Sequence, residues 1–269
     1  METFTYFVPI DFTESCYNAL QYTTTLARNS GGTVKLCHVV DLEEIPESDN
    51  PVVVSFAMDR LLLEAQKKMK SLREIIFMQG VHVKEEIVLG NLRVELLKQI
   101  ESSSPSVVVI GRDSNKQVTS QSLLTCLTRN TDSPVLVVPQ SYNSRTASRA
   151  ILTVDMESKE NGKFSMLSVL IKKVLSLFSA LEVNSLRFGS GNEALEWIEM
   201  MRSRGSVNPN FLSNNNDERL NQMIEFIRTN KIDLFCIQES RNFFGKLFRQ
   251  NISKHLPQPA NGPMLVITL

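Results

Sequence analysis

Short apolar runs alternate with longer amphipathic stretches along the whole chain. In the first half the apolar runs lie at 4–11, 33–40, 81–88, 106–111 and 134–138. The last two, SVVVIG and PVLVV, are almost wholly apolar, which is typical of strands buried on both faces of a parallel sheet. We therefore predict five strands in this half of the chain.

The stretches between these runs have the three- and four-residue spacing of amphipathic helices. Helices are predicted around 16–27, 62–76, 94–100 and 123–127. The acidic segment 41–51 and the polar segment 112–121 show no such period, so both are predicted as loops. Alternation of strands with helices predicts an α/β fold, in which right-handed crossovers wrap helices around a parallel sheet.

The second half repeats this plan in reduced form. Apolar runs recur at 149–155, 181–188, 233–237 and 263–268, with helical spacing at 167–178, 193–204 and 217–229. The segment 206–216 contains Pro209 and several asparagines, so it holds a short strand at best. We therefore predict two tandem domains, 1–140 and 149–269, joined by a polar linker at 141–148, with the second domain shorter in its middle.

The composition of the chain argues against some classes of binding partner. The 269 residues carry 29 basic and 29 acidic side chains, so no overall charge attracts nucleic acid or acidic membranes. No apolar run approaches the ~20 residues that span a bilayer. The chain starts directly with a strand and shows no signal peptide, so we expect a cytoplasmic protein.

Candidate catalytic chemistry is sparse. The four cysteines form no C-x-x-C pair and the three histidines do not cluster, which argues against a metal site. Small buried thiols in a reducing compartment explain the cysteines. No pair of nucleophile and base can be assembled, so we expect a protein that is not an enzyme.

Four segments resemble the universal stress protein family. They are VPIDFTES at 8–15, CHV at 37–39, VVVIG at 107–111 and SPVLVVP at 133–139. The resemblance is good over the first half and weak over the second, and it is that of a tandem bacterial member. It implies that each domain is an open five-stranded parallel sheet of order 3-2-1-4-5, similar to that of the adenine nucleotide alpha hydrolases.

The implied strand order locates a candidate site. It reverses between the first and fourth strands, and ligands of open α/β sheets bind beyond the strand ends at such a reversal. Asp11 and Gly111 end these strands. The resemblance implies that Asp11 helps to hold an adenosine, and that Val39, at the end of the second strand, belongs to the same nucleotide crevice. Asp11 has an equally good alternative role as a cap of the first helix, which Thr13 could also cap.

The family's phosphate-binding motif is altered here. In the members that bind nucleotides, the motif is G-x2-G-x9-G followed by Ser or Thr. Glycine is needed there because it lets the backbone approach the phosphate oxygens closely. Gly111 matches the first glycine, Ser114 and Gln121 replace the other two with six residues between them in place of nine, and Ser122 is retained. We expect a degraded phosphate site, with Ser122 capping the last helix, whose N-terminus could attract a single anionic group.

Two functions follow. The first is a non-catalytic stress-response protein that acts through an unidentified protein partner and needs no cofactor. The alternative is a stress sensor that binds ATP or another adenine nucleotide in the first domain. We expect the two fifth strands to pair within the chain, and the whole chain to be able to form a homodimer. The basic and aromatic segment 241–254 is either a phosphate or nucleic-acid patch or an amphipathic helix with buried phenylalanines.

Overall fold

The computed structural model describes residues 4–45, 49–113 and 117–142, and in the second half Thr229 and the backbone of five strands. The chain divides into two compact units, Met1–Gln140 and Ser141–Leu269.

The first unit contains one parallel sheet. Its strands pair in the order β3-β2-β1-β4-β5, which confirms the predicted 3-2-1-4-5 arrangement. The reversal lies between β1 and β4, where Tyr6 is in register with Val107. The strands are β1 (Thr5–Pro9), β2 (Thr33–Asp41), β3 (His82–Gly90), β4 (Val107–Arg112) and β5 (Val135–Pro139).

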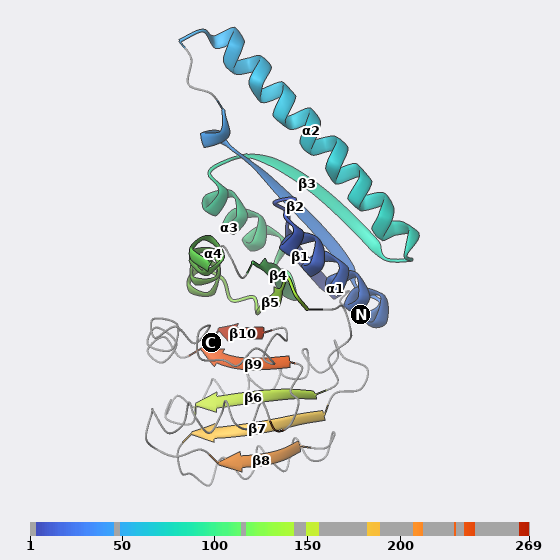
Figure 1. Cartoon of the computed structure of the whole chain (residues 1–269), viewed down its shortest axis with the longest axis vertical. Coiled ribbons are helices and arrows are strands. Elements are labelled where there is room, and N and C mark those ends of the chain that lie inside the picture. Colours follow the sequence, from blue (N-terminus) through green and yellow to red (C-terminus); the bar gives the residue numbers. More distant parts are fainter. Residues whose placement is uncertain are drawn as a thin grey trace. The chain divides into compact units, whose positions relative to one another are not determined.

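Four helices cover the sheet (Figure 1). Right-handed crossovers put the first two helices on one face and the last two on the other. They are α1 (Glu14–Ser30), α2 (Pro51–Met78), α3 (Leu92–Ser103) and α4 (Gln117–Asn130), with a short 3-10 turn, η1, at Leu42–Glu44. In the described part of the chain, no helix offers an apolar stretch sufficient to cross a membrane.

Two helices begin earlier than predicted. α2 starts at Pro51, where the Asn50 side chain accepts a hydrogen bond from the Val52 amide. α4 starts at Gln117, inside the segment that was predicted as a loop. The first turns of α2 are largely exposed and residues 117–121 are mostly polar, so neither start shows the apolar period of a buried face.

The core lies where β1 and β4 run through the centre of the sheet. Tyr6, Phe7 and Val8 of β1 are buried, as are residues 107–110 of β4. This confirms the prediction, made from the apolar runs, that these strands are buried on both faces of the sheet.

The second unit shows the same strand order in its described backbone. β8-β7-β6-β9-β10 pair in parallel, so the first strand of this unit, β6, again lies between its second and fourth. β8 contains Pro209 and ends the order, which is where a sheet tolerates proline. The strands are β6 (Arg149–Asp155), β7 (Glu182–Phe188), β8 (Val207–Phe211), β9 (Leu234–Glu239) and β10 (Met264–Thr268).

Three predictions for the second half lie outside the described residues. The first is the set of helices in this half, of which only Thr229 is described. The second is most of the 141–148 linker, and the third is the basic and aromatic segment 241–254.

Candidate functional site

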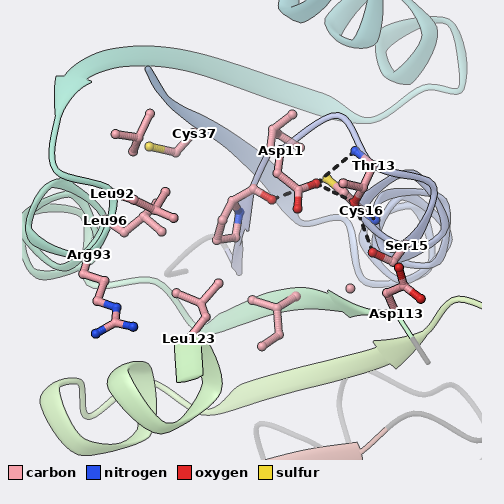
Figure 2. Close-up of a pocket in the computed structure, with 15 residues that line it drawn as sticks. Asp11, Thr13, Ser15, Cys16, Cys37, Leu92, Arg93, Leu96, Asp113 and Leu123 are labelled. Atoms are coloured by element: carbon pink, nitrogen blue, oxygen red, sulfur yellow. Dashed lines mark hydrogen bonds between the residues drawn. The ribbon is translucent and has the colours of Figure 1, made fainter. Parts of the chain in front are cut away.

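A cavity of about 300 Å³ opens at the carboxyl ends of β1 and β4, where the strand order reverses (Figure 2). This is the place that the fold predicts for a ligand, and the volume is at the lower end of the range for small-molecule sites. Its lining comes from β1, β2 and β4, from the loops that follow β1 and β4, from the first turns of α1 and α3, and from α4. The lining residues are Pro9, Ile10, Asp11, Thr13, Ser15, Cys16, Cys37, Val39, Leu92, Arg93, Leu96, Ile110, Gly111, Asp113 and Leu123.

Asp11 and Thr13 form a hydrogen-bonded turn at the start of α1. The Asp11 Oδ1 accepts hydrogen bonds from the Thr13 amide, at 3.0 Å, and from the Thr13 hydroxyl, at 2.6 Å. The Thr13 Oγ1 in turn accepts the Cys16 amide at 3.3 Å, so Thr13 is the N-cap. Of the two predicted caps, Thr13 therefore contacts the helix directly, and Asp11 holds Thr13 in place.

Phe12 lies within this turn and has an unusual backbone conformation. Its φ of 59° lies in the left-handed region, which an aromatic residue rarely adopts. The ring packs against His38 with centroids 4.6 Å apart, and the Lys68 ammonium lies 5.0 Å from the ring centre. His38 Nδ1 also lies 2.7 Å from the Ile10 carbonyl oxygen. These contacts fix the end of β1 against β2, and so fix where the Asp11 carboxylate stands.

Gly111 is in β4, directly beside the first turn of α1. A Cβ at this position would overlap the Ser15 carbonyl and lie 2.8 Å from the Cys16 nitrogen. Side-chain atoms do not approach backbone this closely, so the contact between β4 and α1 requires glycine here. Glycine at 111 is therefore explained by packing, without any phosphate.

The predicted site residues have different outcomes. Asp11, Val39 and Gly111 line the same cavity. Ser114 lies outside the described residues. Ser122 is the sixth residue of α4, because that helix begins at Gln117, so the prediction that Ser122 caps the helix is wrong. Its side chain is not among those that the structure describes.

The apolar wall of the cavity was not predicted. Leu92 and Leu96 come from the first turns of α3, and Cys37 comes from β2. A signal for the start of α3 is present in the sequence, since asparagine, here Asn91, is a preferred N-cap residue. Its side chain accepts the Arg93 amide at 3.2 Å. A right-handed crossover brings the helix that follows β3 back over the sheet.

Charge is unevenly distributed around the cavity. Figure 2 shows Asp11, Thr13, Ser15 and Asp113 on one side, and Cys37, Leu92 and Leu96 on the other. The two carboxylates thus stand on the side where the loop after β4 begins. Arg93 is the one basic side chain among the described lining residues.

The two thiols that line the cavity are buried. Burial raises the pKa of Cys16 to about 12 and that of Cys37 to about 12. Both therefore remain protonated near neutral pH, and a protonated thiol is neither a nucleophile nor a metal ligand. Among the described residues, no group of three or more His, Cys, Asp or Glu side chains is placed to hold a metal ion.

Comparison with known proteins agrees with the fold of the first unit. The sequence profile of the universal stress protein family matches residues 6–139. A universal stress protein of Methanocaldococcus jannaschii is 26% identical over 147 residues, which cover 48% of this chain and 91% of that protein.

Two solved structures are also similar. A universal stress protein from Archaeoglobus fulgidus has a TM-score of 0.73 at 13% identity, covering 100% of this chain and 99% of that one. A universal stress protein family protein from Arabidopsis thaliana, solved with AMP bound, has a TM-score of 0.39 at 16% identity, covering 51% and 91%. The first of these extends the likeness in fold along the full length of the chain.

Proposed function

Residues 6–139 form a domain of the universal stress protein family, and from this premise we propose that the protein is a non-catalytic regulator of the stress response. It acts through contacts with another protein. Its nucleotide crevice no longer holds phosphates, so it needs no cofactor.

One observation carries the proposal, namely that packing accounts for the glycine retained from the phosphate motif. Gly111 is fixed by the closeness of β4 and α1. The other two motif positions are Ser114 and Gln121, which lack the conformational freedom of glycine. Asp11 and Asp113 add negative charge at the same edge of the cavity. A triphosphate thus meets carboxylates there in place of a glycine loop.

The proposal includes the second half of the chain. We regard 149–269 as a second, degenerate domain of the same kind, supported by its strand order and by the likeness in fold to the Archaeoglobus fulgidus protein. A reducing compartment such as the cytoplasm suits the chain, because Cys16, Cys37 and Cys126 are free thiols.

Calorimetry tests the proposal. Mg-ATP titrated into the full chain should give no binding at micromolar concentration, and the denatured protein should release no stoichiometric adenine nucleotide. A phosphate-release assay should show no ATP hydrolysis above the rate without protein. A matched variant, Leu123→Trp, fills the cavity from α4. Micromolar Mg-ATP binding that Leu123→Trp removes would contradict the proposal.

The alternative function is an adenine-nucleotide sensor that uses the same crevice. It is favoured by the first turns of α1 and α3, which both line the cavity, because helix N-termini attract anions. In that case Mg-ATP should bind, and Asp11→Ala should weaken binding while the far-ultraviolet circular dichroism stays unchanged.

A further inference from the structure

The solvent side of α2 carries an apolar stripe. Val52, Phe56 and Leu63 are 57%, 71% and 51% exposed. With about 100° of rotation per residue, the three side chains lie within about 40° of one another. Phe56 lies about 180° around the helix from Ala65, which is buried. α2 is therefore apolar on two opposite sides, and only one of them faces the sheet.

Scattered exposed apolar residues are ordinary in proteins, but an apolar stripe that includes a phenylalanine marks an interaction surface. The stripe has a core of two residues, Phe56 and Leu63. Between these two lie Asp59 and Arg60, both exposed. Their charges are opposite and adjacent, so the order along the stripe is apolar, acidic, basic, apolar.

This order is complementary to itself when the helix is reversed. In an antiparallel pair with its twofold axis between positions 59 and 60, Phe56 of one copy faces Leu63 of the other. Asp59 of each copy then faces Arg60 of the other, which makes two ion pairs next to the axis. A parallel pair would instead place like charges opposite each other. An interface of this kind uses the same surface on both copies, as twofold dimers require.

We propose that the α2 stripe, made of Val52, Phe56, Asp59, Arg60 and Leu63, pairs antiparallel with the same stripe of a second copy of this chain. The observation behind it is the alignment of exposed apolar side chains with a self-complementary charge pair. The inference goes beyond the proposed function, since it holds whether or not the crevice binds a nucleotide.

A membrane surface is the competing occupant. The segment before α2 carries exposed acidic side chains, among them Glu43 and Asp49, and Asp59 stands within the stripe itself. These charges oppose anionic lipid, whereas the exposed Lys67 and Lys70, further along α2, attract it. The self-complementary order of Asp59 and Arg60 favours a second copy of the chain over a membrane, and lipid binding is an outcome of the test.

Sedimentation of the full-length chain is the first experiment. The chain should dimerise, and Phe56→Glu should raise the dissociation constant by about 30-fold or more, as for a buried aromatic anchor. Phe77→Glu is the matched control. Phe77 is on the same helix and 67% exposed, but it lies about 30 Å along the axis from Phe56. The control should dimerise normally, and circular dichroism should show that both variants are folded.

Charge exchange distinguishes this pairing from any other. Asp59→Arg should weaken the dimer because it puts like charges opposite each other. The double variant Asp59→Arg with Arg60→Asp should restore the dimer, because opposite charges again face each other across the axis. A structural effect of Asp59→Arg on the monomer would not be rescued in this way.

Cysteine crosslinking tests the antiparallel register. Arg60→Cys should form a disulfide-linked dimer on mild oxidation, because position 60 lies beside the axis. Glu74→Cys, which is also exposed, should not, since its counterpart would be about 40 Å away.

Three results would overturn the proposal. The first is a chain that stays monomeric at ~100 μM, a concentration at which even weak dimers are populated. The second is a dimer that Phe56→Glu leaves intact. The third is a monomer that binds phosphatidylserine vesicles through Phe56, which would make the stripe a lipid surface.

Discussion

The backbone of Gly111 in β4 lies against the backbone of Ser15 in α1, with no room for a Cβ between them. Sequence comparison reads Gly111 as the start of a phosphate-binding loop. The structure shows that the same residue lets α1 approach the centre of the sheet. The contact between α1 and β4 is therefore a sufficient reason for glycine at position 111.

Gly111→Ala should destabilise the protein. A methyl group would collide with the Ser15 carbonyl, and such overpacking costs about 1–3 kcal/mol in unfolding free energy. Urea denaturation measures the change. Gly80→Ala is the control, because open space surrounds Gly80 and only its positive φ of 78° opposes a side chain. We expect a smaller loss there. Wild-type stability in Gly111→Ala would show that α1 can shift, and that packing does not require the glycine.

Removing Asp11 should weaken the start of α1 through Thr13. Thr13→Ala deletes the cap and should cost about 0.5–2 kcal/mol in unfolding free energy. Asp11→Ala should cost less than Thr13→Ala, and Asp11→Ser should recover most of that loss.

A double-mutant cycle separates the two roles of Asp11. If Asp11 acts by holding Thr13, Asp11→Ala should cost almost nothing in a Thr13→Ala background. Asp41→Ala is the control. Asp41 accepts the Glu43 amide in a similar turn at η1 that does not involve Thr13. Its effect on stability should therefore be the same with and without Thr13→Ala. Additive losses would contradict the role of Asp11 as the support of the cap.

The buried thiols should resist modification. With Cys126 and Cys236 changed to serine, Cys16 and Cys37 remain, and both are buried with a pKa raised to about 12. A disulfide reagent at pH 8 should label neither thiol in the folded protein and both in urea. Rapid labelling of the folded variant would show that the cavity exposes a reactive thiolate.

Stability should fall in alkaline solution. The pKa of Cys16 and of Cys37 rises from about 9 to about 12 on folding, because burial disfavours the thiolate. The unfolded chain therefore loses these protons first. The stabilisation is complete below pH ~9 and declines towards pH ~12, by up to about 1.4 kcal/mol per pH unit for each thiol. Cys16→Ala with Cys37→Ala should flatten this slope in urea titrations, and an unchanged slope would contradict the assignment.

Prediction from the sequence was most successful where burial is strongest. The strands of the first half were found because both faces of the sheet are covered, so their apolar runs are continuous. The strand order, and with it the position of Asp11 and Gly111 at one crevice, came from the family resemblance. The starts of α2 and α4 were missed because the first turns of α2 are largely exposed and the first residues of α4 are mostly polar, so neither sequence shows an apolar period.

The site was predicted only in part, for a similar reason. Residues at strand ends could be placed from the topology, whereas the apolar wall depends on how α3 packs. The turn at Phe12 could not be predicted either, because its left-handed backbone is held by His38 and Lys68, which are distant in sequence. Local propensity assigns a phenylalanine to other conformations.

The last prediction concerns β5 (Val135–Pro139). In the first unit β5 ends the strand order, with β4 on one side. We propose that the fifth strands of the two halves pair within one chain, since an unpaired apolar edge promotes aggregation. The linker can span roughly 30 Å when extended. Tethering also raises the effective concentration to about millimolar, which favours pairing within the chain over pairing between chains.

A fragment of residues 1–142 tests this pairing. It lacks the second half, so one edge of its β5 has no partner, and it should dimerise or aggregate. Phe56→Glu must be included, because pairing through α2 would otherwise give a dimer by a different route. Light scattering of this variant fragment, compared with the full-length Phe56→Glu chain, isolates the contribution of β5. The full-length variant should be monomeric while the fragment associates. A soluble, monomeric fragment would show that the β5 edge is protected within the first unit itself, and the proposed pairing of the fifth strands would then lose its physical reason.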